Sequence, residues 1–96
     1  IIAYEPVWAI STTSGSRGPC TPDMIFQARL VIEKTIASMY DQGVSKTPRI
    51  IYGGSISPDT IASVISAGHM DGALVGSASL NAEIFGRIVR ITATKV

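Results

Sequence analysis

Three short apolar runs divide the chain, and each is rich in residues that favour strands. They cover residues 1–4 (Ile-Ile-Ala-Tyr), 49–52 (Arg-Ile-Ile-Tyr) and 73–75 (Ala-Leu-Val). None of them alternates between apolar and polar positions, so we expect strands that are buried on both faces. Glu5-Pro6 ends the first run, Gly53-Gly54-Ser55 the second and Gly76-Ser77 the third.

The segments between these runs show the spacing of amphipathic helices. Thr21-Pro22-Asp23 predicts a helix start, because threonine caps, proline suits the first turn and aspartate favours the positive end of the helix dipole. Gly43 is expected to end this helix. Ser57-Pro58-Asp59 repeats the start signal, and Asn81 is expected to cap a last helix. The apolar faces expected for the three helices are Ile25, Ala28, Ile32, Ile36 and Met39; Ile61, Val64 and Ile65; and Ile84, Phe85, Ile88 and Ile91.

Strand and helix therefore alternate three times, which predicts an α/β fold with right-handed crossovers and a parallel sheet. Nothing in the sequence marks a domain boundary or a repeat of fixed length. Three parallel strands have two open edges and need cover on both faces. We expect further strands upstream, and a chain that starts on Ile1 without a methionine is what a fragment would show.

Composition narrows the possible partners. The chain is 46% hydrophobic and 16% charged, with a net charge of +1 and no basic stripe, so a nucleic-acid partner is not expected. No apolar run approaches the roughly 20 residues that span a bilayer. The first residues do not have the pattern of a secretion signal, so a secreted protein is not expected. Cys20 is the single cysteine, which is compatible with a reducing compartment.

Residues with candidate chemistry gather where the predicted strands end. In parallel α/β folds this edge of the sheet is where ligands bind. Glu5 offers a carboxylate, and the two glycine–serine turns offer backbone N–H groups that can bind an anion such as phosphate. Together they suggest proton abstraction from a phosphorylated carbonyl compound. Each group alone also has an ordinary explanation, as a solvated carboxylate or a plain connecting turn.

The polar segment 11–20 follows Glu5 and contains mostly serine, threonine, glycine and proline. It can be a lid that excludes water from the site, with Pro6-Val7-Trp8 as a stiff hinge, or an ordinary loop.

Three motifs resemble the triosephosphate isomerase family and cover almost the whole chain in the family's order. They are Ala3 to Ile10 (AYEPVWAI), Tyr52 to Ser55 (YGGS) and Asp71 to Leu80 (DGALVGSASL). The resemblance implies that residues 1–96 are the C-terminal part of a single TIM (β/α)8 barrel domain, its sixth to eighth units. It implies interconversion of dihydroxyacetone phosphate and glyceraldehyde 3-phosphate in glycolysis and gluconeogenesis, with no cofactor and no metal.

The same resemblance implies a role for each matching residue. Glu5 takes the position of the catalytic base, and Tyr52 that of the latch of the closed lid. The phosphate-binding positions fall on Ser11, Ser55, Gly76 and Ser77. Ser11 and Ser77 stand where the family usually has glycine, and the lid is about four residues longer than usual.

The family's asparagine, lysine and electrophilic histidine have no counterpart in this chain. His69 follows Gly68 after a helix and is expected on the surface, and Cys20 is expected to be a bystander. The fragment alone is therefore expected to be inactive. The family resemblance implies that the complete protein is a homodimer, which we expect in the cytoplasm. A paralogous isomerase of four-carbon sugar phosphates and a non-catalytic phosphate-binding module are the alternatives.

Overall fold

The computed structural model describes residues 1–9, 20–41 and 48–95. Within them, strands β1 (Ile2–Tyr4), β2 (Ile50–Gly53) and β3 (Gly72–Leu74) form one parallel sheet in the order β1-β2-β3. The register pairs Ile2 with Ile50 and Gly53 with Leu74. The predicted alternation and parallel sheet are confirmed, with β2 and β3 shifted by one residue from the predicted runs.

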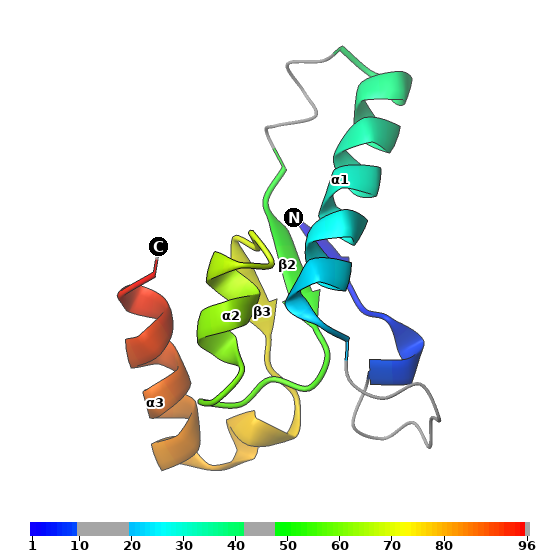
Figure 1. The fold of residues 1–96 in the computed structure, drawn as a ribbon. Helices are drawn as coiled ribbons and strands as arrows, with labels where there is room; N and C mark the ends of the chain where they lie inside the picture. Colours follow the sequence, from blue (N-terminus) through cyan, green and yellow to red (C-terminus); the bar gives the residue numbers. More distant parts are fainter. Residues whose placement is uncertain (10–19, 42–47, 96) are drawn as a thin grey trace.

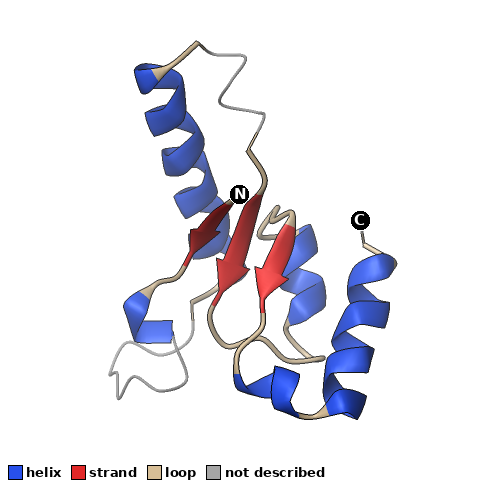
Figure 2. Ribbon diagram, turned by 180° about the vertical axis from the view of Figure 1, so that it is seen from behind, coloured by secondary structure: helices blue, strands red, loops and turns tan. Residues whose placement is uncertain are grey.

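Helices α1 (Pro22–Met39), α2 (Ile61–Ser66) and α3 (Ala82–Ala93) follow the three strands in turn. Figure 1 shows them on one side of the sheet, and Figure 2, from behind, shows the strands with no helix in front of them. Short 3-10 helices η1 (Val7–Ala9) and η3 (Ser77–Leu80) lie at the carboxyl end of the sheet.

Two of the predicted helix caps are confirmed. The Thr21 hydroxyl accepts a hydrogen bond from the Met24 N–H at 3.2 Å, and the Asn81 side chain accepts one from the Ile84 N–H at 3.0 Å. Both bonds satisfy N–H groups that the first turn of a helix leaves without a backbone partner.

Two predicted helix boundaries are wrong. α1 ends at Met39, before Gly43, because Tyr40 already has an extended backbone; Gly43 itself lies outside the described residues. α2 begins at Ile61, because Ser57-Pro58-Asp59 belongs to a hydrogen-bonded turn in which the Ser57 carbonyl accepts from the N–H groups of Thr60 and Ile61.

The core lies between the sheet and the helices. Ile50 and Tyr52 of β2 point into it and are 0% and 2% exposed. Its other buried members are Ile25, Ile56, Ile61, Val64, Ile65, Met70 and Ile88. Much of the predicted apolar faces of α1 and α3 is only partly buried, and Met39 is 65% exposed.

The opposite face of the sheet has little cover within the described residues. Ala3 is exposed, Ile51 is partly buried and Leu74 is 46% exposed. Parallel sheets normally bury both faces, and a closed barrel would bury this one in its interior. No helix in the described part of the chain is long and apolar enough to cross a membrane.

Candidate active site

A pocket of about 330 Å³ opens at the carboxyl end of the sheet. All three strand ends contribute to it, because parallel strands finish at the same edge. Its walls are formed by Glu5, Gly53, Gly54, Ser55, Ile56, Ser57, Thr60, Leu74, Val75, Gly76 and Ser77. Four of the predicted site residues, Glu5, Ser55, Gly76 and Ser77, therefore lie around one cavity.

Glu5 follows β1 directly, and its side chain is exposed toward the pocket. It lies against the backbone of Gly53: a Cβ atom added there would be 2.8 Å from Glu5 Cγ and 2.9 Å from Glu5 Oε1. Real Cβ atoms do not approach other atoms so closely, so only glycine leaves room for this carboxylate. The buried Pro6 fixes the chain immediately after it.

The turn after β2 contains a second close approach. The Tyr52 hydroxyl covers the α-carbon of Gly54 on the side where a side chain would begin. Next along the chain, the Ser55 hydroxyl donates a hydrogen bond to the carbonyl oxygen of Ala9, at 3.1 Å. This bond joins the turn after β2 to η1, the segment that follows Glu5.

The turn after β3 is more open than the turn after β2. A Cβ atom added to Gly76 would meet no described atom within 4 Å, so its backbone is accessible from the pocket. The Gly76 carbonyl is held by the N–H and the hydroxyl of Ser79, at 2.9 and 2.6 Å. Ser77 begins η3, and among the described non-glycine residues only His69 has a positive φ. Serine therefore fits at position 77 without backbone strain.

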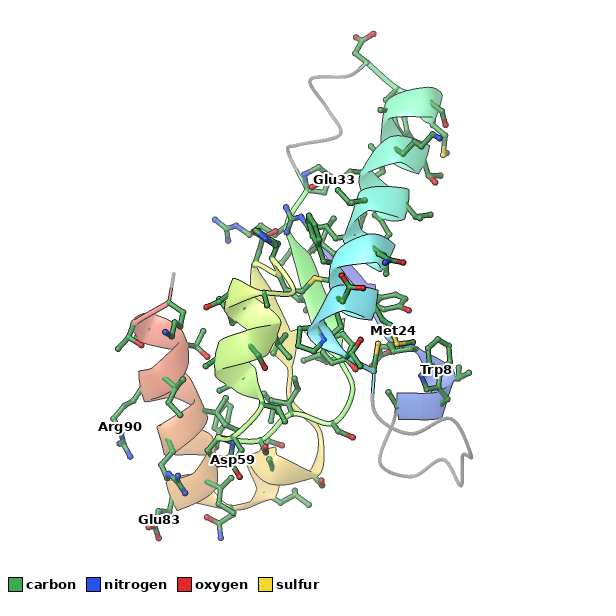
Figure 3. The ribbon with its side chains drawn as sticks, in the orientation of Figure 1. Trp8, Met24, Glu33, Asp59, Glu83 and Arg90 are labelled. Carbon is green, nitrogen blue, oxygen red and sulfur yellow. The ribbon has the colours of Figure 1, made fainter. Side chains whose placement is uncertain are left out.

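The predicted hinge lies beside the pocket and not in its wall. Val7 and Trp8 lie on η1, where Val7 is 68% exposed and Trp8 is partly buried. Figure 3 labels Trp8 on this segment and Met24 on the first turn of α1. Ser11, the predicted lid residue, lies outside the described residues.

Tyr52, the predicted latch, is buried behind the turn and packs against Tyr4 with ring centroids 6.2 Å apart. Its hydroxyl donates a hydrogen bond to the thiol of Cys20. Burial, followed by the influence of Cys20, raises the pKa of the Tyr52 phenol, and burial raises that of the Cys20 thiol. The Cys20 thiol is packed against the core and paired with Tyr52, and it lies outside the pocket wall that contains Glu5.

His69 is exposed, as predicted, and its ring lies against that of Phe26. The described residues contain no group of three or more histidine, cysteine, aspartate or glutamate side chains that could hold a metal ion. The candidate chemistry of the pocket is thus one carboxylate beside two glycine–serine turns, of which the turn after β3 has an uncovered backbone at Gly76.

Comparison with known proteins points to one family. The family model of triosephosphate isomerase matches residues 1–92. A triosephosphate isomerase from Endomicrobium trichonymphae is 42% identical over 90 residues, which are 94% of this chain and 34% of the relative. One from Caldanaerobacter subterraneus subsp. tengcongensis is 45% identical over 89 residues, which are 93% of this chain and 34% of the relative.

The chain thus spans about a third of the length of the curated relatives that it matches. The match includes the ends of all three strands, and with them Glu5 and both glycine–serine turns. With a family model that matches nearly the whole chain, and relatives more than 40% identical to it, the chain belongs to the triosephosphate isomerase family.

Proposed function

We propose that the full-length protein interconverts dihydroxyacetone phosphate and glyceraldehyde 3-phosphate, and that residues 1–96 are the C-terminal part of its barrel domain. The observation that carries this proposal is the position of the Glu5 carboxylate, in one pocket with both glycine–serine turns. A base beside a phosphate site can remove a proton from the carbon next to the substrate carbonyl.

Glu5 is the proposed base. Its carboxylate takes a proton from C1 of dihydroxyacetone phosphate, and the C–H electron pair moves to form the enediolate. The protonated Glu5 then returns the proton to C2, while the proton of the C1 hydroxyl passes to the C2 oxygen, which gives glyceraldehyde 3-phosphate. The contact with Gly53 supports this role, because it places the carboxylate at the carboxyl end of β2, beside the turn that is proposed to bind the phosphate.

The phosphate is proposed to bind the backbone N–H groups of Ser55, Gly76 and Ser77. Successive N–H groups in turns form concave sites for anions without requiring a charged side chain. Access supports this assignment, since all three residues line the pocket and the backbone of Gly76 is uncovered. Binding of the phosphate would fix the reacting carbons beside Glu5.

Closure of a lid over this site is proposed as well. Pro6, Val7 and Trp8 would form its hinge, the Ser11 N–H would meet the phosphate, and Tyr52 would hold the closed form. The bond from Ser55 to Ala9 supports a connection between hinge and phosphate turn. A closed lid would protect the enediolate from water.

The experiment that tests this function compares substrates of different length. Purified full-length protein is assayed with dihydroxyacetone phosphate and with a four-carbon ketose phosphate. We expect a clearly higher kcat/KM for the three-carbon substrate. Preference for the four-carbon substrate would favour the paralogous isomerase, and phosphate binding without turnover of either would favour the non-catalytic module.

Family membership is the support for our proposals on assembly and location. A homodimer in the cytoplasm is the arrangement that we propose for the full-length protein. Light scattering coupled to size exclusion measures the mass in solution, and a monomeric mass at assay concentration would contradict the dimer.

A further inference from the structure

Thr60 is the last residue of the loop that joins β2 to α2. Its hydroxyl oxygen is 2.9 Å from the Ser57 backbone nitrogen and 3.2 Å from the Ser55 carbonyl oxygen. It is also 3.3 Å from the Ser57 hydroxyl and 3.4 Å from the Ser57 carbonyl oxygen. One side chain thus contacts the loop at both Ser55 and Ser57.

These contacts use the full capacity of a hydroxyl group, which has one proton to donate and two lone pairs. The Ser57 N–H donates to Thr60 Oγ1, and the Ser57 hydroxyl can donate to its second lone pair. The Thr60 proton is then directed at the Ser55 carbonyl, the nearer of the two carbonyl oxygens. The Ser57 hydroxyl in turn accepts from the Asp59 N–H at 3.2 Å.

This use of the side chain is unusual for a residue that precedes a helix. A threonine in that position commonly caps the helix by accepting from its first N–H groups. Thr60 has a helical backbone and makes no such bond to α2. Its hydroxyl faces backward, toward the turn that carries Ser55. Ser55 is therefore held from two sides, by Thr60 through its carbonyl and by Ala9 of η1 through its hydroxyl.

We propose that Thr60 is a positioning residue for the phosphate site. Its hydroxyl fixes the backbone of residues 55–57, and with it the direction of the Ser55 N–H. This inference rests on the proposed function, because it assigns Thr60 to the phosphate side of the same pocket, whose wall it shares. Thr60 acts through the backbone of Ser55, whereas Glu5 follows β1 and lies against Gly53.

Two variants of the full-length protein distinguish the effect of the Thr60 hydroxyl from the effect of the size of its side chain. Thr60→Val keeps the shape and removes all hydrogen bonds, whereas Thr60→Ser keeps the hydroxyl and removes a methyl group. Three quantities are measured for each: KM for dihydroxyacetone phosphate, the inhibition constant of inorganic phosphate, and kcat/KM for glyceraldehyde, which lacks the phosphate.

Thr60→Val is expected to raise the KM and the inhibition constant about tenfold, the effect of losing a hydrogen bond that orients a binding group. Thr60→Val should also lower kcat/KM more for dihydroxyacetone phosphate than for glyceraldehyde, and the difference should be about the same factor. Thr60→Ser should stay within about threefold of the unmodified protein. A purely structural role would lower turnover of both substrates equally.

Equal losses on the two substrates, or unchanged phosphate inhibition in Thr60→Val, would overturn the inference. If Thr60→Val does not fold, Thr60→Ala is measured in its place; failure of both to fold would also contradict a role confined to the phosphate site. Absence of turnover and of phosphate inhibition in the unmodified protein would overturn the proposed function instead, which keeps the two failures apart.

Discussion

The carboxylate of Glu5 rests on the α-carbon of Gly53, a residue of the neighbouring strand. A Cβ atom at position 53 would lie 2.9 Å from Glu5 Oε1. Gly53 is the last residue of β2 and Glu5 follows the last residue of β1, and the parallel register brings the two strand ends together. The absent side chain of Gly53 thus provides the space in which the candidate base lies.

Gly53→Ala should therefore lower kcat in the full-length protein. The added methyl group forces Glu5 out of its place, and a displacement of about 1 Å can lower the rate about 100-fold. We expect a loss of this order in kcat, with the inhibition constant of phosphate much less affected. Steady-state kinetics with dihydroxyacetone phosphate measure both quantities.

Gly86→Ala provides the matched control for that substitution. Gly86 lies within α3, away from the pocket, and an added Cβ would make only an ordinary contact of 3.6 Å with Arg90. It should leave kcat unchanged and stabilise the protein by about 0.5–1 kcal/mol through helix propensity. If Gly53→Ala kept the kcat of Gly86→Ala, the steric account of Glu5 would be wrong.

Alkaline pH should destabilise the folded protein through Cys20 and Tyr52. Burial raises the pKa of both groups, so the folded state keeps their protons at pH values where the unfolded chain loses them. The stability that they contribute is complete below the pKa of the unfolded thiol, about 8.5, and is lost as the pH rises above it.

Urea unfolding of the full-length protein between pH 7 and 10.5 measures this effect. The free energy of unfolding should fall with pH, and it should fall less steeply in Cys20→Ala and in Tyr52→Phe. A slope unchanged by both substitutions would contradict the assignment.

Asp71 should stabilise the start of β2, at the end of the sheet opposite the pocket. Its Oδ2 atom accepts hydrogen bonds from the Ile50 N–H at 2.9 Å and from Arg29 Nη1 at 3.1 Å. Asp71→Asn weakens both bonds and should destabilise the protein by about 1–3 kcal/mol. The exposed Glu83→Gln should stay within about 0.5 kcal/mol. Similar denaturation midpoints for the two variants would show that the Asp71 bonds contribute little.

The order of elements and most of the pocket were predictable because they depend on local signals. Thr21 and Asn81 cap their helices within the next three residues, and strand ends in a parallel sheet meet at one edge. Glu5, Ser55, Gly76 and Ser77 could be assigned to one site on that rule and on the family motifs.

The contacts that hold these residues in place were not predictable. Arg29 and Asp71 are 42 positions apart, and Ser55 and Ala9 are 46 apart, so only the folded chain brings them together. Thr60 contacts residues close to it in the sequence, but its hydroxyl bonds back to Ser55 and does not cap α2. Residue type alone does not decide between these two hydrogen bonds. Cys20 and Tyr52 are likewise far apart in the sequence and meet only in the folded chain.

Exchange of substrate hydrogen with solvent tests the role of Glu5 most directly. Full-length protein and its Glu5→Gln variant are incubated with dihydroxyacetone phosphate in deuterium oxide, and NMR follows deuterium entering the carbon next to the carbonyl. Glutamine keeps the size of the side chain but cannot accept the proton. We predict that the variant loses exchange and turnover by at least about 1,000-fold while inorganic phosphate still binds. Exchange at close to the unmodified rate would contradict the assignment of Glu5 as the base.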